Sequence, residues 1–224
     1  DLLATREQFC FDIETTSLDR FEARLLGIAF SWKAGEACYV PITEDAHLER
    51  FRPALTGPAE KIGHNLHYDL AVLLNRGLEV SGPFFDTLLA HRLLYPDQRH
   101  TMDFLAESLL GYRPIKLAEL AAQAGQADDL FAHAAASGSI DAATIPLEKL
   151  AEYAAEDADV TFQLAAKLAP ELETQGQKKV FYEIESPLLP VLVAIENEGI
   201  TLDLAILEES GRQLQKRIDE LSVS

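Results

Sequence analysis

The first third of the chain alternates between apolar and polar positions with the period of β-strands. Three alternating runs, at residues 8–16, 24–32 and 36–42, are separated by short polar segments that contain turn residues. Connections this short favour antiparallel pairing, because a parallel pair needs a crossover of about a dozen residues or more. The pattern therefore predicts an antiparallel meander of three strands.

Beyond the meander, the pattern changes to strands that lead into helices. Residues 61–65 predict a short strand, followed by a helix over 66–77 that ends at Gly77, since glycine readily adopts the left-handed conformation of a helix C-terminus. Residues 82–94 predict another strand and helix, with Asp86 as the helix N-cap. A meander followed by strand–helix units is typical of an α/β domain with a mixed sheet.

The rest of the chain is predicted to be almost wholly helical. Residues 145–172 form one long periodic segment, with Pro146 near its start, where proline is favoured. Residues 121–145 are rich in Ala, Gly, Ser and Asp without a clear period, and predict a short helix within a mobile loop. The long segment therefore predicts a single long helix.

A change in composition at residues 172–179 marks the start of a helical C-terminal region. Ser186 and Pro187 are predicted to be the N-cap and first residue of a helix that ends near Gly199, because serine and proline favour these positions. Residues 203–221 predict a final amphipathic helix. We therefore expect a helical appendage to the α/β domain.

Composition limits the classes of protein to consider. The chain has 224 residues, of which 48% are hydrophobic, enough for one domain with a large core and an appendage. No apolar run approaches the roughly 18 residues of a membrane span, and no signal peptide is evident. Two cysteines are too few for a disulfide framework, so we expect a cytoplasmic location, and the missing initial Met suggests a fragment.

The net charge of −18, with a pI near 4.6, argues against binding nucleic acid through a broad basic surface. It does not exclude a nuclease, because divalent cations in an acidic pocket reverse the local field and let a phosphodiester approach. We expect such a chain to bind DNA weakly and in a salt-sensitive way.

Two carboxylates interrupt the first strand, in the stretch FCFDIETTS. Phe9, Phe11 and Ile13 share one face of this strand, whereas Asp12 and Glu14 share the other. Asp and Glu are poor strand formers, and two on one face can bind one metal ion. However, chance predicts about six acidic-x-acidic pairs in so acidic a chain, so taken alone the pair is better explained as a solvent-facing strand edge.

Asn65 and Asp69, in GHNLHYD, are four residues apart and share a face of the predicted helix. They are either site residues, or a helix cap and a first-turn acid that favours the helix dipole.

Tyr153 and Asp157, in YAAEDAD, share a face of the long helix in the same way. Glu156 and Asp159 flank them, so a solvated acidic face is the alternative to a site.

In this order, the three segments resemble the DEDD 3′–5′ exonucleases of the Tyr subtype, and within them the proofreading domains of bacterial DNA polymerase I, a family A polymerase. The matching segments span most of residues 8–168 and are FDIETTSLD, GHNLHYD, FDTLLAHRLL, HTMDFLAESLLG and YAAEDADVT. YEIESPLLPVLVAIENEGITLD is similar to the start of the polymerase region. The resemblance implies a ribonuclease H-like exonuclease domain over 1–175, flanked by helices, and a truncated polymerase region over 176–224.

The resemblance further implies that four carboxylates bind two divalent ions, Mg²⁺ or Mn²⁺, which prefer oxygen ligands. By motif, Asp12 bridges the ions, Glu14 and Asp157 hold the ion that binds the nucleophilic water, and Asp69 supports the other. Tyr153 orients that water. The implied reaction hydrolyses the 3′-terminal phosphodiester of single-stranded or frayed DNA and releases 5′-nucleotides, as in proofreading during replication and repair.

The remaining residues implied by the resemblance bind the strand. Thr15 and Leu18 follow the first strand, and Leu18 packs on the terminal base. Asn65 bonds the terminal nucleotide or a metal-bound water, and Arg99 pairs with a phosphate. Leu117 stands near the position of a family Phe, so base stacking there stays open.

Three alternatives remain at this point. The first is an RNA-trimming exonuclease with the same four acids, and the second is a catalytically silent module that supports a polymerase. The third is an acidic interaction domain in which the four carboxylates do not converge. In the main hypothesis, the partners are a DNA 3′ end and the rest of a polymerase chain. We expect no membrane contact, and a monomeric fragment without a polymerase active site.

Overall fold

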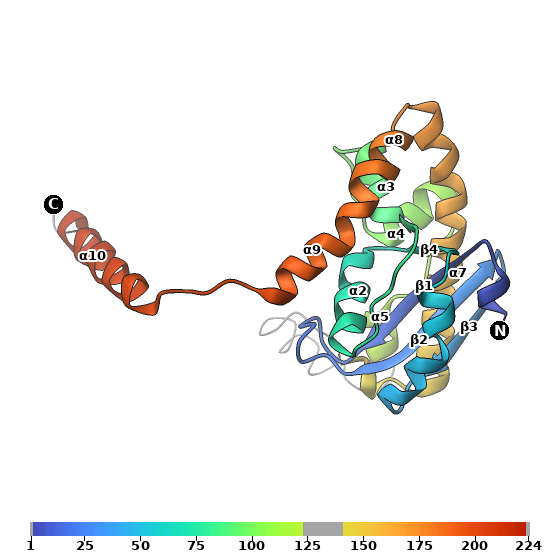
Figure 1. The fold of residues 1–224 in the computed structure, drawn as a ribbon, viewed down its shortest axis with the longest axis horizontal. Helices are drawn as coiled ribbons and strands as arrows, with labels where there is room; N and C mark the ends of the chain where they lie inside the picture. Colours follow the sequence, from blue (N-terminus) through green and yellow to red (C-terminus); the bar gives the residue numbers. More distant parts are fainter. Residues whose placement is uncertain (1, 123–140, 223–224) are drawn as a thin grey trace. The chain divides into compact units, whose positions relative to one another are not determined.

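The structure, a computed structural model, describes residues 2–122 and 141–222 (Figure 1). Most of the segment predicted to hold a short helix in a mobile loop, 121–145, lies outside the described residues. The chain forms two compact units, Asp1–Ala194 and Ile195–Ser224. The predicted boundary between exonuclease-like and polymerase-like sequence stays a prediction.

The first unit is built on a five-stranded sheet with the order β3-β2-β1-β4-β5. The strands are β1 (Gln8–Thr15), β2 (Leu25–Lys33), β3 (Glu36–Pro41), β4 (Glu60–Gly63) and β5 (Phe84–Asp86). The strands β1, β2 and β3 pair antiparallel, whereas β4 pairs parallel to both β1 and β5. This arrangement confirms the predicted mixed sheet of a meander plus parallel strands.

Helices follow the strands in the predicted order. The α-helices of the first half are α1 (Arg52–Leu55), α2 (Leu66–Asn75), α3 (Thr87–Leu94), α4 (Met102–Leu105) and α5 (Leu117–Ala121). Those of the second half are α7 (Leu147–Thr174), α8 (Lys178–Val180), α9 (Ser186–Glu198) and α10 (Leu204–Ser222). Short 3₁₀ helices cover Leu3–Thr5, Asp45–Arg50 and Ala142–Thr144, and π-helical turns cover Ala106–Leu110 and Phe181–Glu185. Within 2–122 and 141–222, no helix is both long and apolar enough to cross a bilayer.

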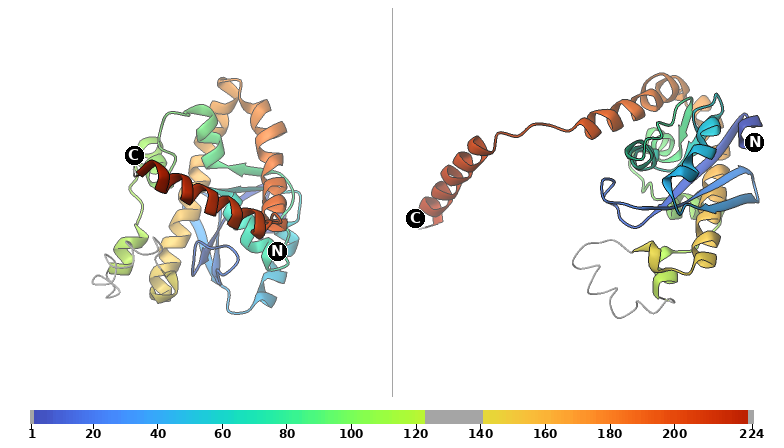
Figure 2. Two further views of the ribbon diagram at one scale, coloured as in Figure 1. Left: turned by 90° about the vertical axis from the view of Figure 1, so that its left-hand side faces the viewer. Right: turned by 60° about the horizontal axis from the view of Figure 1, so that its bottom comes forward.

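The alternation along β1 divides the core into two layers. Phe9, Phe11 and Ile13 pack into the cluster that contains the apolar face of α2. On the other face of the sheet, Cys10 packs with Ala29 and the apolar stripe of α7. Figures 1 and 2 show α7, in yellow, lying along the strands β1 to β3. The sheet is therefore covered on both faces, and Asp12 and Glu14 point toward the α7 layer.

Asp86, at the end of β5, caps two helices at once. As predicted, it is the N-cap of α3, where Oδ1 accepts hydrogen bonds from the amides of Leu88 (2.8 Å) and Leu89 (3.3 Å). Its carboxylate also accepts the amides of Asn65 (3.1 Å) and Leu66 (2.8 Å) at the start of α2. The side chain is 1% exposed. One buried carboxylate therefore satisfies amides at the start of both helices.

We predict that Asp86→Ala lowers the free energy of unfolding by about 3 kcal/mol, because it leaves four buried or half-buried amides without acceptors. Urea unfolding followed by far-ultraviolet circular dichroism measures the loss. Asp141→Ala is the control, because Asp141 is exposed and caps only a 3₁₀ turn through the Ala143 amide. The double-cap interpretation is wrong if the two variants lose equal stability.

Ser186 is not a helix N-cap, as the sequence had predicted. The backbone is helical from Lys178 through the π-helical turn Phe181–Glu185 and into α9, and Ser186 itself has helical φ and ψ angles of −64° and −46°. Its hydroxyl donates a hydrogen bond to the carbonyl of Phe84 in β5 (2.7 Å). The serine therefore ties α9 to the edge of the sheet, so Pro187 lies within continuous helix rather than at a start.

Candidate active site

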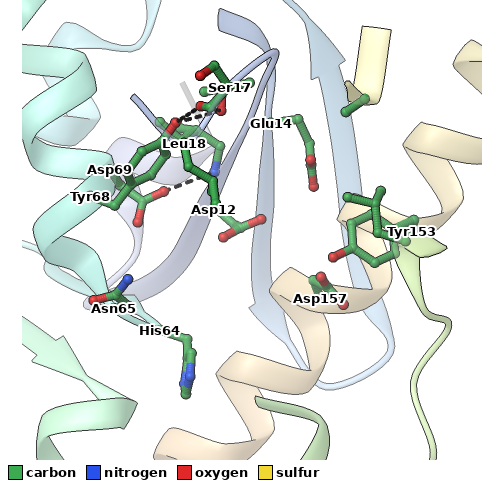
Figure 3. A pocket seen from close by; sticks show the side chains of 14 residues that line it. Asp12, Glu14, Ser17, Leu18, His64, Asn65, Tyr68, Asp69, Tyr153 and Asp157 are labelled. Carbon is green, nitrogen blue, oxygen red and sulfur yellow. Dashed lines mark hydrogen bonds between the residues drawn. The ribbon is translucent and has the colours of Figure 1, made fainter. Parts of the chain in front are cut away.

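A pocket of about 360 Å³ opens at the carboxyl ends of the parallel strands β1 and β4 (Figure 3). This edge of a sheet is where ligands commonly bind in α/β proteins. The pocket is lined by Asp12, Ile13, Glu14, Thr15, Ser17, Leu18, His64, Asn65, Tyr68, Asp69, Leu117, Ala142, Tyr153 and Asp157. It therefore brings together every predicted site residue except Arg99, which is exposed between α3 and α4.

Asp12 and Glu14 reach the pocket because small residues stand opposite them in the sheet. Asp12 pairs with Ala29 and Glu14 with Gly27 across β1 and β2. Neither neighbour carries a side chain long enough to reach over the carboxylate opposite it. Glu14 is only 8% exposed, so the solvent-facing strand edge considered for this pair is wrong.

Asp69 connects α2 to the first strand. Its Oδ1 accepts a hydrogen bond from the backbone amide of Ile13 (3.2 Å), and the side chain is 5% exposed. The amide lies between Asp12 and Glu14 in sequence, so this bond fixes the first two motifs relative to each other. A surface acid that serves only the helix dipole does not make such a contact.

Asn65 is at the N-cap position of α2, but its side chain makes no capping bond. Its backbone is in the left-handed region (φ 64°), the only described non-glycine residue with a positive φ, a conformation that asparagine adopts more easily than most residues. Asp86 accepts the amides at this end of the helix instead. The cap interpretation of Asn65 is therefore wrong, and its side chain lines the pocket.

Tyr153 and Asp157 come from α7, on the opposite side of the pocket from α2 (Figure 3). Tyr153 packs against the small buried cluster of Leu120, Ala142, Ile145 and Leu150. Asp157 is 6% exposed, and its Oδ1 has no hydrogen-bond partner among the described residues. A buried carboxylate oxygen without a donor is unusual, and it is a ready ligand for a cation.

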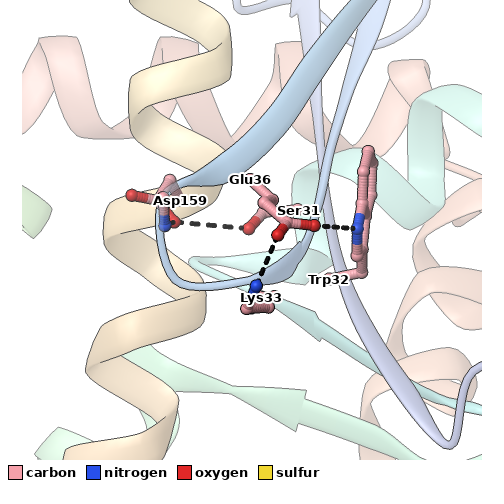
Figure 4. Close-up of polar contacts among 6 residues, drawn as sticks. Ser31, Trp32, Lys33, Glu36 and Asp159 are labelled. Atoms are coloured by element: carbon pink, nitrogen blue, oxygen red, sulfur yellow. Dashed lines mark hydrogen bonds and ion pairs between the residues drawn. The ribbon is translucent and has the colours of Figure 1, made fainter.

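The two acids that flank this pair do not form a solvated face. Glu156 accepts hydrogen bonds from the Tyr112 hydroxyl and from the Ile115 amide (2.7 Å). Asp159 accepts the Gly35 amide in the β2–β3 turn (2.8 Å), near the ion pair of Lys33 with Glu36 (Figure 4). Each acid of the motif thus has a separate task, and the solvated-face alternative is wrong.

We predict that Glu156→Ala lowers the free energy of unfolding by about 1–2 kcal/mol, because the half-buried Ile115 amide loses its acceptor. Hydrogen exchange of that amide should also accelerate. Glu152→Ala is the matched control on the same helix: Glu152 is exposed and forms an ion pair with Lys149, so a change below about 0.5 kcal/mol is expected. Unchanged exchange at Ile115 would contradict the assignment.

Burial and mutual repulsion raise the pKa values of the carboxyl groups that line the pocket. Burial raises the pKa of Asp12 to about 7. Burial, followed by the charges of Asp12, Asp157 and Asp69, raises the pKa of Glu14 well above its usual range. The pKa values of Asp69 and Asp157 are raised by burial first and by Asp12 second. His64 cannot offset this charge, because burial lowers its pKa to about 4.

The donor set fits hard divalent cations. Every carboxylate that lines the pocket offers only oxygen atoms, which Mg²⁺ and Mn²⁺ prefer to nitrogen and sulfur. In the described ranges, no three His, Cys, Asp or Glu side chains are close enough together to hold one ion. The carboxylates instead stand around the pocket, which suits Mg²⁺, since this ion usually keeps several waters and uses one or two carboxylates.

The rim of the pocket is held by a residue that the sequence did not single out. The Tyr68 hydroxyl donates a hydrogen bond to the Ser17 carbonyl (2.5 Å) and lies 2.7 Å from Oγ1 of Thr15. These bonds fix the loop after β1, which presents Leu18 with 73% of its surface exposed. The signal for Tyr68 was its spacing, three residues after Asn65 on one helix face.

Solved structures share this architecture. Brucella melitensis NrnC bound to pGG has a TM-score of 0.69 and 25% identity, over 88% of this chain and 87% of that chain, and NrnC with bound Mg²⁺ has a TM-score of 0.68 at 24% identity over 88% of each. The POL domain of Pol1 from M. smegmatis, in complex with DNA primer-template and dNTP, has a TM-score of 0.75 at 19% identity, over 98% of this chain and 33% of that chain. A mixed sheet with acids on its central strand and on helices at both faces defines a ribonuclease H-like nuclease, as predicted.

Sequence comparison is more specific. Residues 1–173 match the family model described as 3′-5′ exonuclease, and the chain belongs to this family. DNA polymerase I of Pseudomonas aeruginosa is 33% identical over 232 residues, covering 96% of this chain and 24% of that protein. The chain spans about a quarter of the length of the curated relatives it matches. The family inferred from the three motifs is therefore confirmed.

Proposed function

We propose that this chain is the metal-dependent 3′–5′ exonuclease domain of a bacterial DNA polymerase I, which hydrolyses the last phosphodiester of a single-stranded or frayed DNA 3′ end. The observation that carries the proposal is the convergence of four carboxylates from β1, α2 and α7 on one pocket, in a chain of the 3′–5′ exonuclease family. Terminal mismatches fray most readily, so the enzyme favours them without reading bases.

The carboxylates have distinct roles in this proposal. Asp12, Glu14 and Asp157 would hold the divalent cation that supplies the attacking water, and Asp12 and Asp69 would hold the cation beside the leaving oxygen, after the carboxylates move closer together than they stand in the described residues. When bound, such ions supply an activated water and stabilise the leaving oxygen. The hydrogen bond from the Ile13 amide to Asp69 fixes the position of Asp69 relative to Asp12 and Glu14 before substrate binds.

Tyr153 would orient the attacking water by donating a hydrogen bond to it. Burial, and then the charge of Asp157, raises the pKa of Tyr153 far above its usual range. The phenol therefore stays protonated at neutral pH and acts as a donor rather than as a general base. Its packing against the cluster of Leu120, Ala142, Ile145 and Leu150 holds the ring in place.

The remaining predicted residues would hold the strand. Leu18, exposed on the rim, offers an apolar surface to the terminal base. Asn65 and Thr15 present polar side chains inside the pocket, where a sugar or phosphate would lie. Arg99 is outside the pocket, so it would meet a phosphate further along the strand. Leu117 forms part of the wall, where it supplies apolar contact in place of an aromatic ring.

End-labelled oligonucleotides test the proposal directly. With Mg²⁺ or Mn²⁺, single strands labelled at the 3′ end should release a labelled mononucleotide at once, whereas 5′-labelled strands should shorten stepwise. Similarity to NrnC, whose structure holds pGG, makes RNA the second candidate substrate, so DNA and RNA of one sequence are compared. Faster RNA cleavage would favour the RNA-trimming alternative. Intact substrate would favour a structural module that supports the rest of a polymerase chain.

A further inference from the structure

The hydroxyl of Tyr39 in β3 is buried, yet it has no hydrogen-bond partner in the part of the chain that the structure describes. Oδ1 of Asp157 is the other buried side-chain atom there with this property. Buried hydroxyls are normally hydrogen bonded, because an unmet donor has lost the bonds that water gave it. The strand register shows which groups the Tyr39 hydroxyl faces.

Tyr39 lies in the same cross-strand row as a pocket carboxylate. It pairs with Ala29 of β2, which pairs in turn with Asp12 of β1. One row further along, Gly27 pairs with Glu14. Directly paired residues point to the same face of a sheet, so Tyr39, Asp12 and Glu14 all project toward the α7 layer.

The Tyr39 side chain crosses from its own row into the row of Glu14. A Cβ atom placed on Gly27 would lie 2.2 Å from the Tyr39 hydroxyl oxygen and 2.2 Å from the ring carbon that bears it. The end of the phenol therefore occupies the space that any side chain at position 27 would need. Glycine at this position is what allows Tyr39 to reach toward Glu14.

The hydroxyl therefore lies on the side of Tyr39 that faces Glu14, although it forms no hydrogen bond with that carboxylate in the described residues. Directly opposed residues such as Glu14 and Gly27 have Cβ positions about 5 Å apart. The Tyr39 hydroxyl lies next to the Cβ position of residue 27, so it is about this far from the Cβ atom of Glu14. Burial, and then the negative charge of Glu14, raises the pKa of Tyr39. A phenol that stays protonated near a carboxylate is available to donate a hydrogen bond to it.

We propose that Tyr39 is a positioning residue of the exonuclease site: its hydroxyl, which lies over Gly27 and has no partner among the described residues, donates a hydrogen bond to Glu14 when divalent cations are bound and holds that carboxylate toward the pocket. This inference rests on the proposed function, in which Glu14 is a ligand. Tyr39 does not line the pocket and acts only through Glu14. When one oxygen of a carboxylate accepts such a hydrogen bond, the other oxygen stays directed at a cation in the pocket.

Tyr39→Phe tests this role, because it removes only the hydroxyl and keeps the ring over Gly27. We expect kcat on single-stranded DNA to fall about tenfold and the dissociation constant for Mn²⁺, measured by calorimetry, to rise at least about threefold. The melting temperature of the metal-free protein should stay constant or rise by about 2–4 °C, because an unmet buried donor is removed. Tyr95→Phe is the matched control, since its hydroxyl bonds Glu171 outside the pocket: the melting temperature should fall while kcat and Mn²⁺ binding stay constant.

Unchanged kcat and Mn²⁺ binding in Tyr39→Phe would overturn the inference. So would a fall in melting temperature with no loss of Mn²⁺ affinity, because the hydroxyl would then serve only the fold. If the wild-type protein degrades neither DNA nor RNA, the proposed function fails, whereas the comparison of Mn²⁺ affinities still decides whether Tyr39 positions Glu14.

Discussion

Replacing both Asp12 and Asp157 by alanine is expected to reduce the release of 3′-terminal nucleotides from single-stranded DNA by at least about 1000-fold. The two residues stand on opposite walls of the pocket, on β1 and α7, so the double variant removes ligands from both sides. Folding should survive, because both changes relieve repulsion among buried carboxylates. A label at the 3′ terminus, followed over time with Mg²⁺, measures the loss.

Asp159→Asn provides the control for this experiment. Asp159 follows Asp157 by two residues on α7, but it bonds the β2–β3 turn instead of lining the pocket. Its variant should keep activity within about threefold of the wild type. If the double variant retains the full rate, the four-carboxylate assignment is wrong and activity in the preparation must come from another site.

We also expect the stability of the metal-free protein to fall as the pH rises toward 7, and divalent cations to restore it. The pKa of Asp12 rises on folding from 3.8 to about 7, so the metal-free protein has its full stability from this group below about pH 4 and loses it as the pH rises through 7. The corresponding free energy is at most about 4 kcal/mol, and less because Asp12 borders the solvent-filled pocket. Glu14, Asp69 and Asp157 act in the same direction.

Urea unfolding in the presence of a chelator, at half-unit steps from pH 4 to pH 8, measures this effect. The difference between Asp12→Asn and the wild type isolates Asp12, since His64 titrates equally in both: the variant should become progressively the more stable protein toward pH 7. Millimolar Mn²⁺ should restore stability to the wild type at pH 7 and do so less in the variant. A difference that stays constant with pH would contradict the burial of Asp12.

The fold and the central acids could be predicted because each left a local signal. The period-2 alternation around Phe9 and Phe11 placed β1 and its two faces. The spacings Asn65 to Asp69 and Tyr153 to Asp157 placed pairs on helix faces, and the order of the three motifs supplied the family. None of these local patterns alone separated a site from a solvated surface, and the resemblance was needed for that.

The features that could not be predicted depend on contacts between segments distant in sequence. Ser186 has the local signature of an N-cap, but its hydroxyl bonds the Phe84 carbonyl, 102 positions earlier. Glu156 has the signature of a surface acid, but bonds Ile115, 41 positions away. Tyr39 approaches Glu14 only through the register of three strands. A sequence pattern with a local period carries no information about such pairings.

The double cap at Asp86 affects how the wall of the pocket unfolds locally. The helices α2 and α3 share one acceptor, so neither can unravel from its first turn without exposing the amides of the other. Local unfolding should therefore involve both helices as one cooperative unit. Asn65 and Asp69, at the start of α2 and within it, form one wall of the pocket. We therefore expect this wall to unfold locally only when β5 and both helices unfold together.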